Sequence, residues 1–314
     1  MSPAQLEARA SFPDRGVILA FALSTLLAGA NAVAVRFTVA ELSPFWGAGM
    51  RFTGAGLIFV LMALLRRRPA PTRSELKASA LYGVIGFGTA YALLYWGLQT
   101  VQAGMAQVIL AMTPLLTLLF AVLHRLERFR WRGLIGSLIA VSGIGIAFYD
   151  GEAAPMSLLP MLAVAGGAAC FAEASIVLKR QTTPDPVVAN AIGMTTGAIM
   201  LLALSVLNGE TWALPRLAST WLSVIYLVIV GSVVVFYMIV FVLGHWTASA
   251  SSYQLVLMPF VTVALGAWLL GERVGSGLLV GGALVLIGVW VGAFSRSRPT
   301  GIEQAAGALP AEGD

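Results

Sequence analysis

The stretch AGMAQVILAMTPLLTLLFAVLHRLERF, residues 103–129, has a counterpart 145 residues further along the chain, ASASSYQLVLMPFVTVALGAWLLGERV, residues 248–274. Both stretches carry a proline near the middle, Pro114 and Pro259, and both contain a Glu-Arg pair near their end. Further identities at this offset join Thr117 to Thr262, Gly136 to Gly281 and Gly143 to Gly288. Each stretch is long and apolar enough to cross a membrane as a helix. The chain therefore contains two related halves.

The composition of the whole chain is that of a membrane protein. Of its 314 residues, 59% are hydrophobic and only 11% are charged, which lies far outside the range of soluble domains. A spanning helix needs about 20 apolar residues, so ten spans use about 200 and leave no room for a sizeable soluble domain. A single cysteine, Cys170, and two histidines exclude a disulfide framework and argue against a zinc site. We expect no cofactor.

Ten apolar runs of spanning length predict an all-α polytopic membrane protein with ten transmembrane helices. The predicted spans are residues 16–39, 44–65, 75–98, 103–124, 131–149, 156–178, 185–207, 218–243, 248–270 and 276–295. The first five make up one five-helix repeat, 16–149, and the last five make up a second, 156–295. Residues 1–15 are predicted to be a cytoplasmic N-terminus, and residues 299–314 a disordered cytoplasmic tail.

Lysine and arginine predict which loops face the cytoplasm, because short cytoplasmic loops hold them in excess. With the N-terminus inside, 15 of the 19 basic residues fall in cytoplasmic segments and only Arg216 and Arg273 fall in outer loops. We therefore predict that both termini are cytoplasmic. The basic residues lie between spans rather than on one solvated face, so we expect no nucleic-acid partner. Residues 9–30 also mimic a cleavable secretory signal, but the apolar run continues to Ala40, which favours a first spanning helix.

Five spans per half is an odd number, so the second half must enter the membrane upside down. The charges agree, because Glu127-Arg128 is predicted to lie inside and Glu272-Arg273 outside. Inverted repeats are typical of transporters, whose substrate sites lie near the bilayer midplane between the repeats. Matching Pro44 with Pro186 places Asn31 in span 1 opposite Glu173 in span 6, and Asn31 is a candidate for binding substrate.

The proline-bearing fourth span, the Glu-Arg at its end and the glycine-spaced fifth span of each half resemble the drug/metabolite transporter superfamily, and within it the EamA family. The aromatic-rich third and fourth spans are similar to those of the YddG-type aromatic amino-acid exporters. The resemblance covers residues 16 to 295. It implies two inverted five-helix repeats around a central cavity, in which the substrate is exposed alternately to either side.

Three ionisable residues lie within predicted spans and are functional candidates, because a charge in hydrocarbon needs a partner or water. Glu173 is a candidate for proton coupling or for binding a substrate amine, with a structural carboxyl as the alternative. Arg51, two turns inside the outer end of span 2, is a candidate for holding a carboxylate, or pairs with an outer acid such as Glu41. Arg36 is interpreted as an end residue whose charge reaches the interface.

Aromatic and amide side chains add candidates for lining a substrate cavity. They are Tyr82, Tyr91, Tyr95, Trp96, Gln107, Tyr237, Tyr253 and Gln254. Such groups suit a neutral zwitterion with an apolar or aromatic side chain, although Tyr and Trp near span ends are also interfacial anchors. Pro114 and Pro259 each remove a backbone hydrogen bond within a span, so they are candidate hinges or static bends.

The sequence argues against an enzyme, because it has no H-E-x-x-H or G-x-S-x-G motif and no second intramembrane carboxylate beside Glu173. His124 and His245 fall at span ends and are interpreted as solvated. Two alternative transport functions stay open. One is multidrug or cation efflux, in which Glu173 binds the cation. The other is a sugar-phosphate or nucleotide-sugar carrier, which needs more basic groups in the cavity than two arginines.

We therefore predict a bacterial inner-membrane exporter of small neutral metabolites, with amino acids first and aromatic ones preferred. The expected partners are a small-molecule substrate, an amino acid or related metabolite, and the lipid bilayer. A monomer is the simplest assembly.

Overall fold

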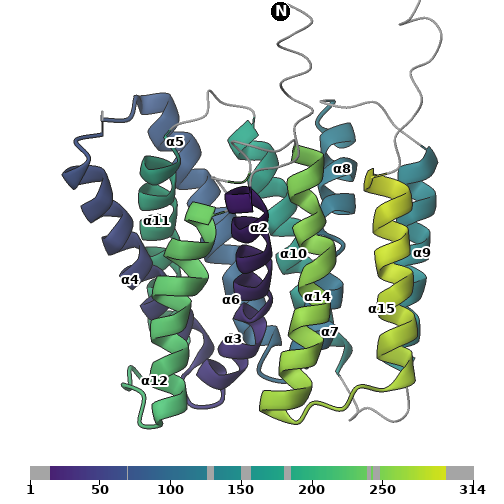
Figure 1. Cartoon of the computed structure of the whole chain (residues 1–314). Helices are drawn as coiled ribbons and strands as arrows, with labels where there is room; N and C mark the ends of the chain where they lie inside the picture. Colours follow the sequence, from purple (N-terminus) through teal and green to yellow (C-terminus); the bar gives the residue numbers. More distant parts are fainter. Residues whose placement is uncertain are drawn as a thin grey trace, which may run out of the picture.

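The computed structural model of the chain describes residues 15–68, 70–125, 131–149, 157–179, 185–238, 242 and 248–294. Every regular element in these ranges is a helix, which confirms the predicted all-α class. Figure 1 shows the helices standing side by side along a common direction, with their connections gathered at the two ends of the bundle.

The helices follow one another with short connections. In chain order they are α2 (Arg15–Gly29), α3 (Asn31–Val39), α4 (Pro44–Leu65), α5 (Arg73–Tyr82), η1 (Gly83–Thr89), α6 (Ala90–Gly97), α7 (Ala103–Leu110), α8 (Thr113–Leu123), α9 (Trp131–Tyr149), α10 (Leu158–Lys179), α11 (Pro186–Leu207), α12 (Ala218–Ile225), η2 (Tyr226–Val234), α14 (Ala248–Leu270), α15 (Ser276–Val289) and η3 (Trp290–Phe294). The η elements are π-helical, so their hydrogen bonds reach back five residues instead of four.

Seven helical segments are long and apolar enough to cross a membrane. They are Arg15–Val39, Pro44–Leu65, Arg73–Gly97, Ala103–Leu123, Leu158–Val177, Val187–Leu207 and Ala218–Met238. Shorter apolar helices at Trp131–Ala147, Leu257–Leu270 and Ser276–Gly292 lie where the other predicted spans are. Large apolar side chains such as Leu57, Leu138 and Ile199 are exposed on the outside of the bundle, as a surface in contact with lipid requires. The chain is thus a multi-pass membrane protein, and the ten-span inverted repeat stays a prediction.

The two ends of the bundle differ in the charged residues that follow their helices. Glu41, Glu210 and Glu272 follow the C-terminal ends of α3, α11 and α14, at what we call the carboxylate end. This is the lower end in Figure 1, where α12 and α15 begin. Arginines follow α4 and α8 and begin α5 at the opposite end, which we call the arginine end.

Several of the spans are not continuous α-helices. The first span breaks at Ala30, between α2 and α3, and the fourth breaks at Ala111 and Met112, just before Pro114 in the first turn of α8. Pro259, by contrast, lies inside an uninterrupted α14. The third and eighth spans each contain a π-helical stretch, η1 and η2, and the two overlap when the chain is shifted by the offset that relates its halves. Irregular turns of this kind often occur at functional sites.

Glycines bring α9 and α15 into backbone contact. A Cβ at Gly136 would overlap the carbonyl oxygen of Gly288, and a Cβ at Gly143 would overlap that of Gly281. Small residues allow this approach between membrane helices. The regularly spaced glycines of the last span, Gly281 and Gly288, therefore pack against α9 of the other half within the same chain.

Candidate functional site

A cavity of about 250 Å³ lies where helices of both halves meet. Its polar lining groups are Asn31 of α3, Arg51 of α4, Gln107 of α7, Thr113 of α8 and Gly231 of η2. Its aromatic lining groups are Tyr91 of α6, Phe171 of α10 and Phe236, which follows η2. A small, mostly apolar cavity with a few convergent polar groups is the usual form of a metabolite site.

Arg51 is the charged group of this cavity. The residue is 1% exposed, and it is the largest fully buried side chain in the described part of the protein. Its Nε donates to Ser232 Oγ at 3.1 Å, and its Nη2 donates to the carbonyl oxygen of Gly231 at 3.2 Å. The guanidinium carbon lies 5.0 Å from the ring centres of both Phe52 and Tyr91, within the range of cation–π attraction. These contacts fix the position of the charge at the cavity wall.

Two side chains of the first half bond to the π-helical η2 at the Gly231 carbonyl. The hydroxyl of Ser232 bonds to the Leu227 carbonyl five residues back, and the Gly231 carbonyl accepts bonds from two side chains of the other half. One of these donors is Arg51, and the other is Asn31 Nδ2 at 3.2 Å. A Cβ at position 231 would collide with Asn31 Oδ1. Glycine is therefore required here for the close approach of Asn31.

Aromatic rings form a connected wall beside Arg51. Tyr91 lies at the centre of this wall, with its ring centre 4.5 Å from Phe52 and 5.1 Å from Phe171. Phe87 lies between Tyr91 and Phe236, with its ring centre 6.2 Å from that of Tyr91 and 5.9 Å from that of Phe236. The contacts of Tyr91 with Phe52 and Phe171 are edge-to-face, an arrangement that aromatic quadrupoles favour. The cavity thus places one cation beside a surface suited to a flat apolar group.

The protein is tightly closed between the cavity and the carboxylate end. Tyr95 and Leu98 in the third span and Met105 in α7 are all completely buried in this region. Toward the arginine end, the side chains of His124 and Glu173 are each 29% exposed. Among these residues, those toward the carboxylate end are therefore the less exposed.

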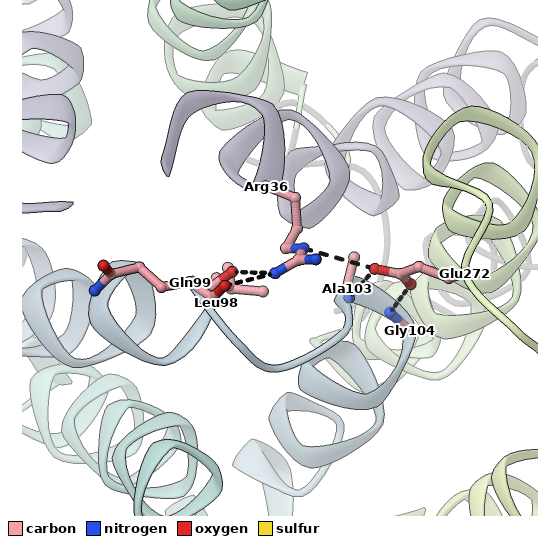
Figure 2. Close-up of polar contacts among 6 residues, drawn as sticks. All are labelled: Arg36, Leu98, Gln99, Ala103, Gly104 and Glu272. Atoms are coloured by element: carbon pink, nitrogen blue, oxygen red, sulfur yellow. Dashed lines mark hydrogen bonds and ion pairs between the residues drawn. The ribbon is translucent and has the colours of Figure 1, made fainter. Parts of the chain in front are cut away.

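A clasp of two charged side chains fastens the carboxylate end, as Figure 2 shows. Arg36 Nη1 donates to the carbonyls of Leu98 and Gln99, at 2.8 and 3.0 Å, where α6 ends. Glu272 accepts from the backbone amides of Ala103 and Gly104, at 2.7 and 3.2 Å, where α7 begins. The cation of Arg36 meets the C-terminal end of α6 and the carboxylate of Glu272 meets the N-terminal end of α7, so each charge is opposite to that of the helix end. Arg36 Nε lies 3.8 Å from Glu272 Oε1. The turn between the third and fourth spans is thus held from both sides.

Gly271 allows Glu272 to reach α7. Its φ of +63° lies in the left-handed region, which ends α14 and turns the chain back so that the Glu272 amide bonds to the Gly266 carbonyl at 3.1 Å. The glycine before this glutamate therefore has a structural role.

Two further carboxylates cap helices of the opposite half at the same end. Glu210 accepts from the amides of Phe45 and Trp46 at the start of α4, at 3.2 and 2.8 Å. Glu41 accepts from the amides of Arg216 and Leu217 before α12. The Thr220 hydroxyl and these amides lower the pKa of the Glu41 carboxyl below its ordinary value. Glu41 therefore caps α12 and forms no ion pair with Arg51.

The sequence profile of the EamA-like transporter family matches the chain twice, at residues 15–149 and 158–293. The chain belongs to the EamA-like transporter family. The inner membrane transporter YedA of Escherichia coli K12 is 28% identical over 257 residues, which cover 79% of this chain and 81% of YedA. A probable terminal-alkyne amino-acid exporter of Streptantibioticus cattleyicolor is 30% identical over 234 residues, or 70% of this chain and 73% of the relative.

A solved crystal structure has the same fold as this EamA-like transporter. The two superpose with a TM-score of 0.62 over 88% of this chain and 96% of the other, at 20% sequence identity. At this identity the likeness concerns the fold alone. Closeness to the YddG-type branch stays a prediction.

Four of the predicted site residues line the cavity of this EamA-like transporter, namely Asn31, Arg51, Tyr91 and Gln107. Others lie elsewhere. Tyr95 is completely buried behind the cavity lining, beside Arg51 and Tyr91. Tyr82 packs against Phe87, and Tyr237 is 56% exposed on the outside of the bundle. Trp96 is half-buried and is absent from the cavity lining. The side chains of Tyr253 and Gln254 lie outside the described part of the structure.

Glu173 faces the arginine end rather than the cavity lining. Its two carboxylate oxygens lie 2.9 and 3.0 Å from Nε2 of His124, which caps the C-terminus of α8. His124 was expected to be solvated at its span end, whereas the structure gives it this partner. The pair joins the fourth span to the sixth, and so joins the two halves at the end opposite to the clasp.

Proposed function

We propose that this protein exports small neutral metabolites, with amino acids first and aromatic ones preferred, by alternating access of a central cavity. The observation that carries the proposal is the composition of the cavity, which combines one fixed cation with Tyr91, Phe171 and Phe236. A volume of about 250 Å³ lies just below the usual range of about 300 to 1,000 Å³ for pockets that bind drug-sized ligands. The name of the exporter from Streptantibioticus cattleyicolor supports the substrate class.

The proposal includes two inverted five-helix halves in a bacterial inner membrane, with the carboxylate end outside. The excess of lysine and arginine at the arginine end supports a cytoplasmic location for that end. The clasp then closes the outer side, and the His124–Glu173 pair lies toward the cytoplasm. In this state the cavity accepts substrate from inside the cell, as export requires.

The rival substrates fit the cavity less well. Cation efflux through Glu173 needs this carboxylate to face the substrate, but Glu173 bonds to His124 and is absent from the cavity lining. A sugar phosphate needs several basic groups, and among the described lining residues Arg51 is the one cation.

Transport into proteoliposomes tests the proposal. The purified protein is given labelled tryptophan, phenylalanine, threonine, a cationic drug and a sugar phosphate, each with and without a pH gradient. We expect saturable uptake of the amino acids, fastest for the aromatic ones. Uptake of the drug or the sugar phosphate alone would overturn the proposal.

A pair of tyrosine variants provides the matched comparison. Tyr91→Leu removes a ring from the cavity wall and is expected to reduce aromatic amino-acid transport about two- to tenfold, because one lost aromatic contact costs about 0.5 to 1.5 kcal/mol. Tyr237→Leu changes an exposed ring outside the cavity and is expected to leave transport unchanged. Equal effects of the two substitutions would argue against the cavity as the substrate site.

A further inference from the structure

Arg51 is a buried cation that no carboxylate of the described residues balances. Its acceptors Ser232 Oγ and the Gly231 carbonyl are neutral, and the hydroxyl of Tyr95 lies beside it. The ion pairs in the described ranges join Arg36 to Glu272, Arg68 to Asp185 and His124 to Glu173. An unpaired buried charge is costly, so a charge retained within a membrane protein is a candidate site for a ligand that supplies its counter-charge.

Asn31 provides a second donor beside this cation. Asn31 Nδ2 and Arg51 Nη2 each lie 3.2 Å from one atom, the carbonyl oxygen of Gly231. Two donors that share one acceptor lie close enough together to be bridged by the two oxygens of a single carboxylate. Both side chains also line the cavity, so this bridging position can be reached by a bound molecule.

We propose that Arg51 and Asn31 form a carboxylate-binding subsite, with one carboxylate oxygen on the guanidinium and the other on the amide. The inference rests on the proposed function and narrows it, because it requires that the substrate carry a free carboxylate. Gly231 holds the two donors in place while the subsite is empty. The remainder of the substrate then lies against the rings of Tyr91, Phe171 and Phe236.

The arginine is suited to this role by its orientation as well as its charge. The rings of Phe52 and Tyr91 contact the guanidinium carbon from 5.0 Å each, and Ser232 holds Nε. A guanidinium fixed in this way presents its donors in one plane, which matches a carboxylate better than a lysine ammonium does. A lysine at position 51 therefore retains the charge and loses the geometry.

Ligand pairs that differ at the carboxylate test the subsite directly. The purified full-length protein in lipid nanodiscs is titrated with phenylalanine, phenylalaninamide and 3-phenylpropionate, and binding is measured by calorimetry. We expect phenylalanine to bind about 100-fold more tightly than its amide, since two charge-assisted hydrogen bonds contribute about tenfold each. The propionate, which keeps the carboxylate without the amine, is expected to bind more tightly than the amide.

Four variants assign this preference to residues. Arg51→Met and Asn31→Leu each remove one of the two donors and are each expected to reduce the ratio between acid and amide about tenfold, to about ten. Arg51→Lys, which retains the charge and loses the geometry, is expected to leave a ratio between about ten and about 100. Arg36→Met is the matched control, because it removes another intramembrane arginine that lies at the clasp. The control is expected to retain the wild-type ratio.

Thermal unfolding of the same variants separates binding from folding. Because Arg51 carries an uncompensated charge, Arg51→Met is expected to retain the wild-type unfolding temperature without ligand or to exceed it. If Arg51→Met does not fold, Arg51→Lys and Asn31→Leu still decide the question.

The outcomes distinguish the subsite from the proposed function. If phenylalanine and its amide bind equally to the wild-type protein, the subsite is refuted and amino-acid transport still stands. If Arg51→Met keeps the wild-type ratio, Arg51 does not bind the carboxylate. If neither phenylalanine, tryptophan, threonine nor 3-phenylpropionate binds at all, the proposed function itself fails.

Discussion

Replacing Glu272 by alanine should loosen the carboxylate end of the bundle. The substitution leaves the amides of Ala103 and Gly104 without their carboxylate acceptor and removes the counter-charge of Arg36. Hydrogen bonds to charged groups contribute about 1.5 to 3 kcal/mol each, and water that enters the loosened turn replaces part of this. A net cost of about 2 to 3 kcal/mol raises the population of the open form roughly 30- to 140-fold, at 1.4 kcal/mol per tenfold.

Thiol labelling measures this opening. Cys170 is the protein's single cysteine, so Cys170→Ala gives a background without thiols, and Val101→Cys then places one thiol in the closed region. Val101 is 1% exposed and lies in the turn between Arg36 and Glu272. When opening is fast relative to modification, the rate of labelling by a membrane-impermeant maleimide follows the open population. We expect Glu272→Ala to increase this labelling rate roughly 30- to 140-fold.

Glu75→Ala serves as the matched control for loss of a helix cap. Glu75 forms a capping box with Thr72 at the start of α5, within one half of the chain. Its loss costs about 0.5 to 2 kcal/mol of local helix stability and touches no contact between the halves. If Glu272→Ala folds normally and Val101→Cys is labelled no faster than in the Glu75→Ala background, the clasp does not hold this end closed.

Gly231→Ala should reduce transport at least about tenfold, because the added methyl group displaces Asn31. Gly145→Ala is the control, because a methyl group there meets no atom within 4 Å, and it should leave transport rates unchanged. Glu173→Gln should abolish any pH dependence of proteoliposome transport by neutralising the partner of His124, and an unaltered pH profile would exclude Glu173 from coupling. The pKa of Glu41 is lowered in the folded protein, so its cap on α12 stabilises the fold above the ordinary pKa of 4.5 and this stabilisation is lost as the pH falls through the lower folded pKa. Amide hydrogen exchange at the start of α12 should therefore stay slow at pH 4.5. Fast exchange there would contradict the role of Glu41 as the cap of α12.

Apolar run length and helix-end residues were sufficient to predict most helix bounds. The predicted spans 44–65, 131–149 and 248–270 coincide with α4, α9 and α14. Pro44 begins α4 because proline suits a first helical turn, and Gly271 ends α14. The break at Ala30 and the π-helical η1 and η2 were not predicted, because these segments are as apolar as the regular helices beside them.

The candidate site was predictable where a polar group lies deep within a span. Asn31, Arg51 and Gln107 stand out in apolar sequence, and each lines the cavity. Phe171 and Phe236 were missed because an apolar aromatic ring gives the same sequence signal in a core, in a cavity wall and on a lipid-facing surface. Phe236 lines the cavity while its neighbour Tyr237 is exposed, since consecutive helical residues point about 100° apart. The contacts of Glu272, which lies 169 residues from Ala103 in the chain, depend on tertiary structure alone.

The glycine contact between α9 and α15 has a consequence for how the protein can move. Where Gly136 meets Gly288 and Gly143 meets Gly281, the touching atoms belong to the backbone, so no side-chain rotation can absorb a displacement. We therefore expect these two helices to move together as one rigid body, even though they come from different halves of the chain. A pair of spectroscopic labels on their outer faces would keep a constant separation throughout a transport cycle and give a fixed frame for measuring the other helices.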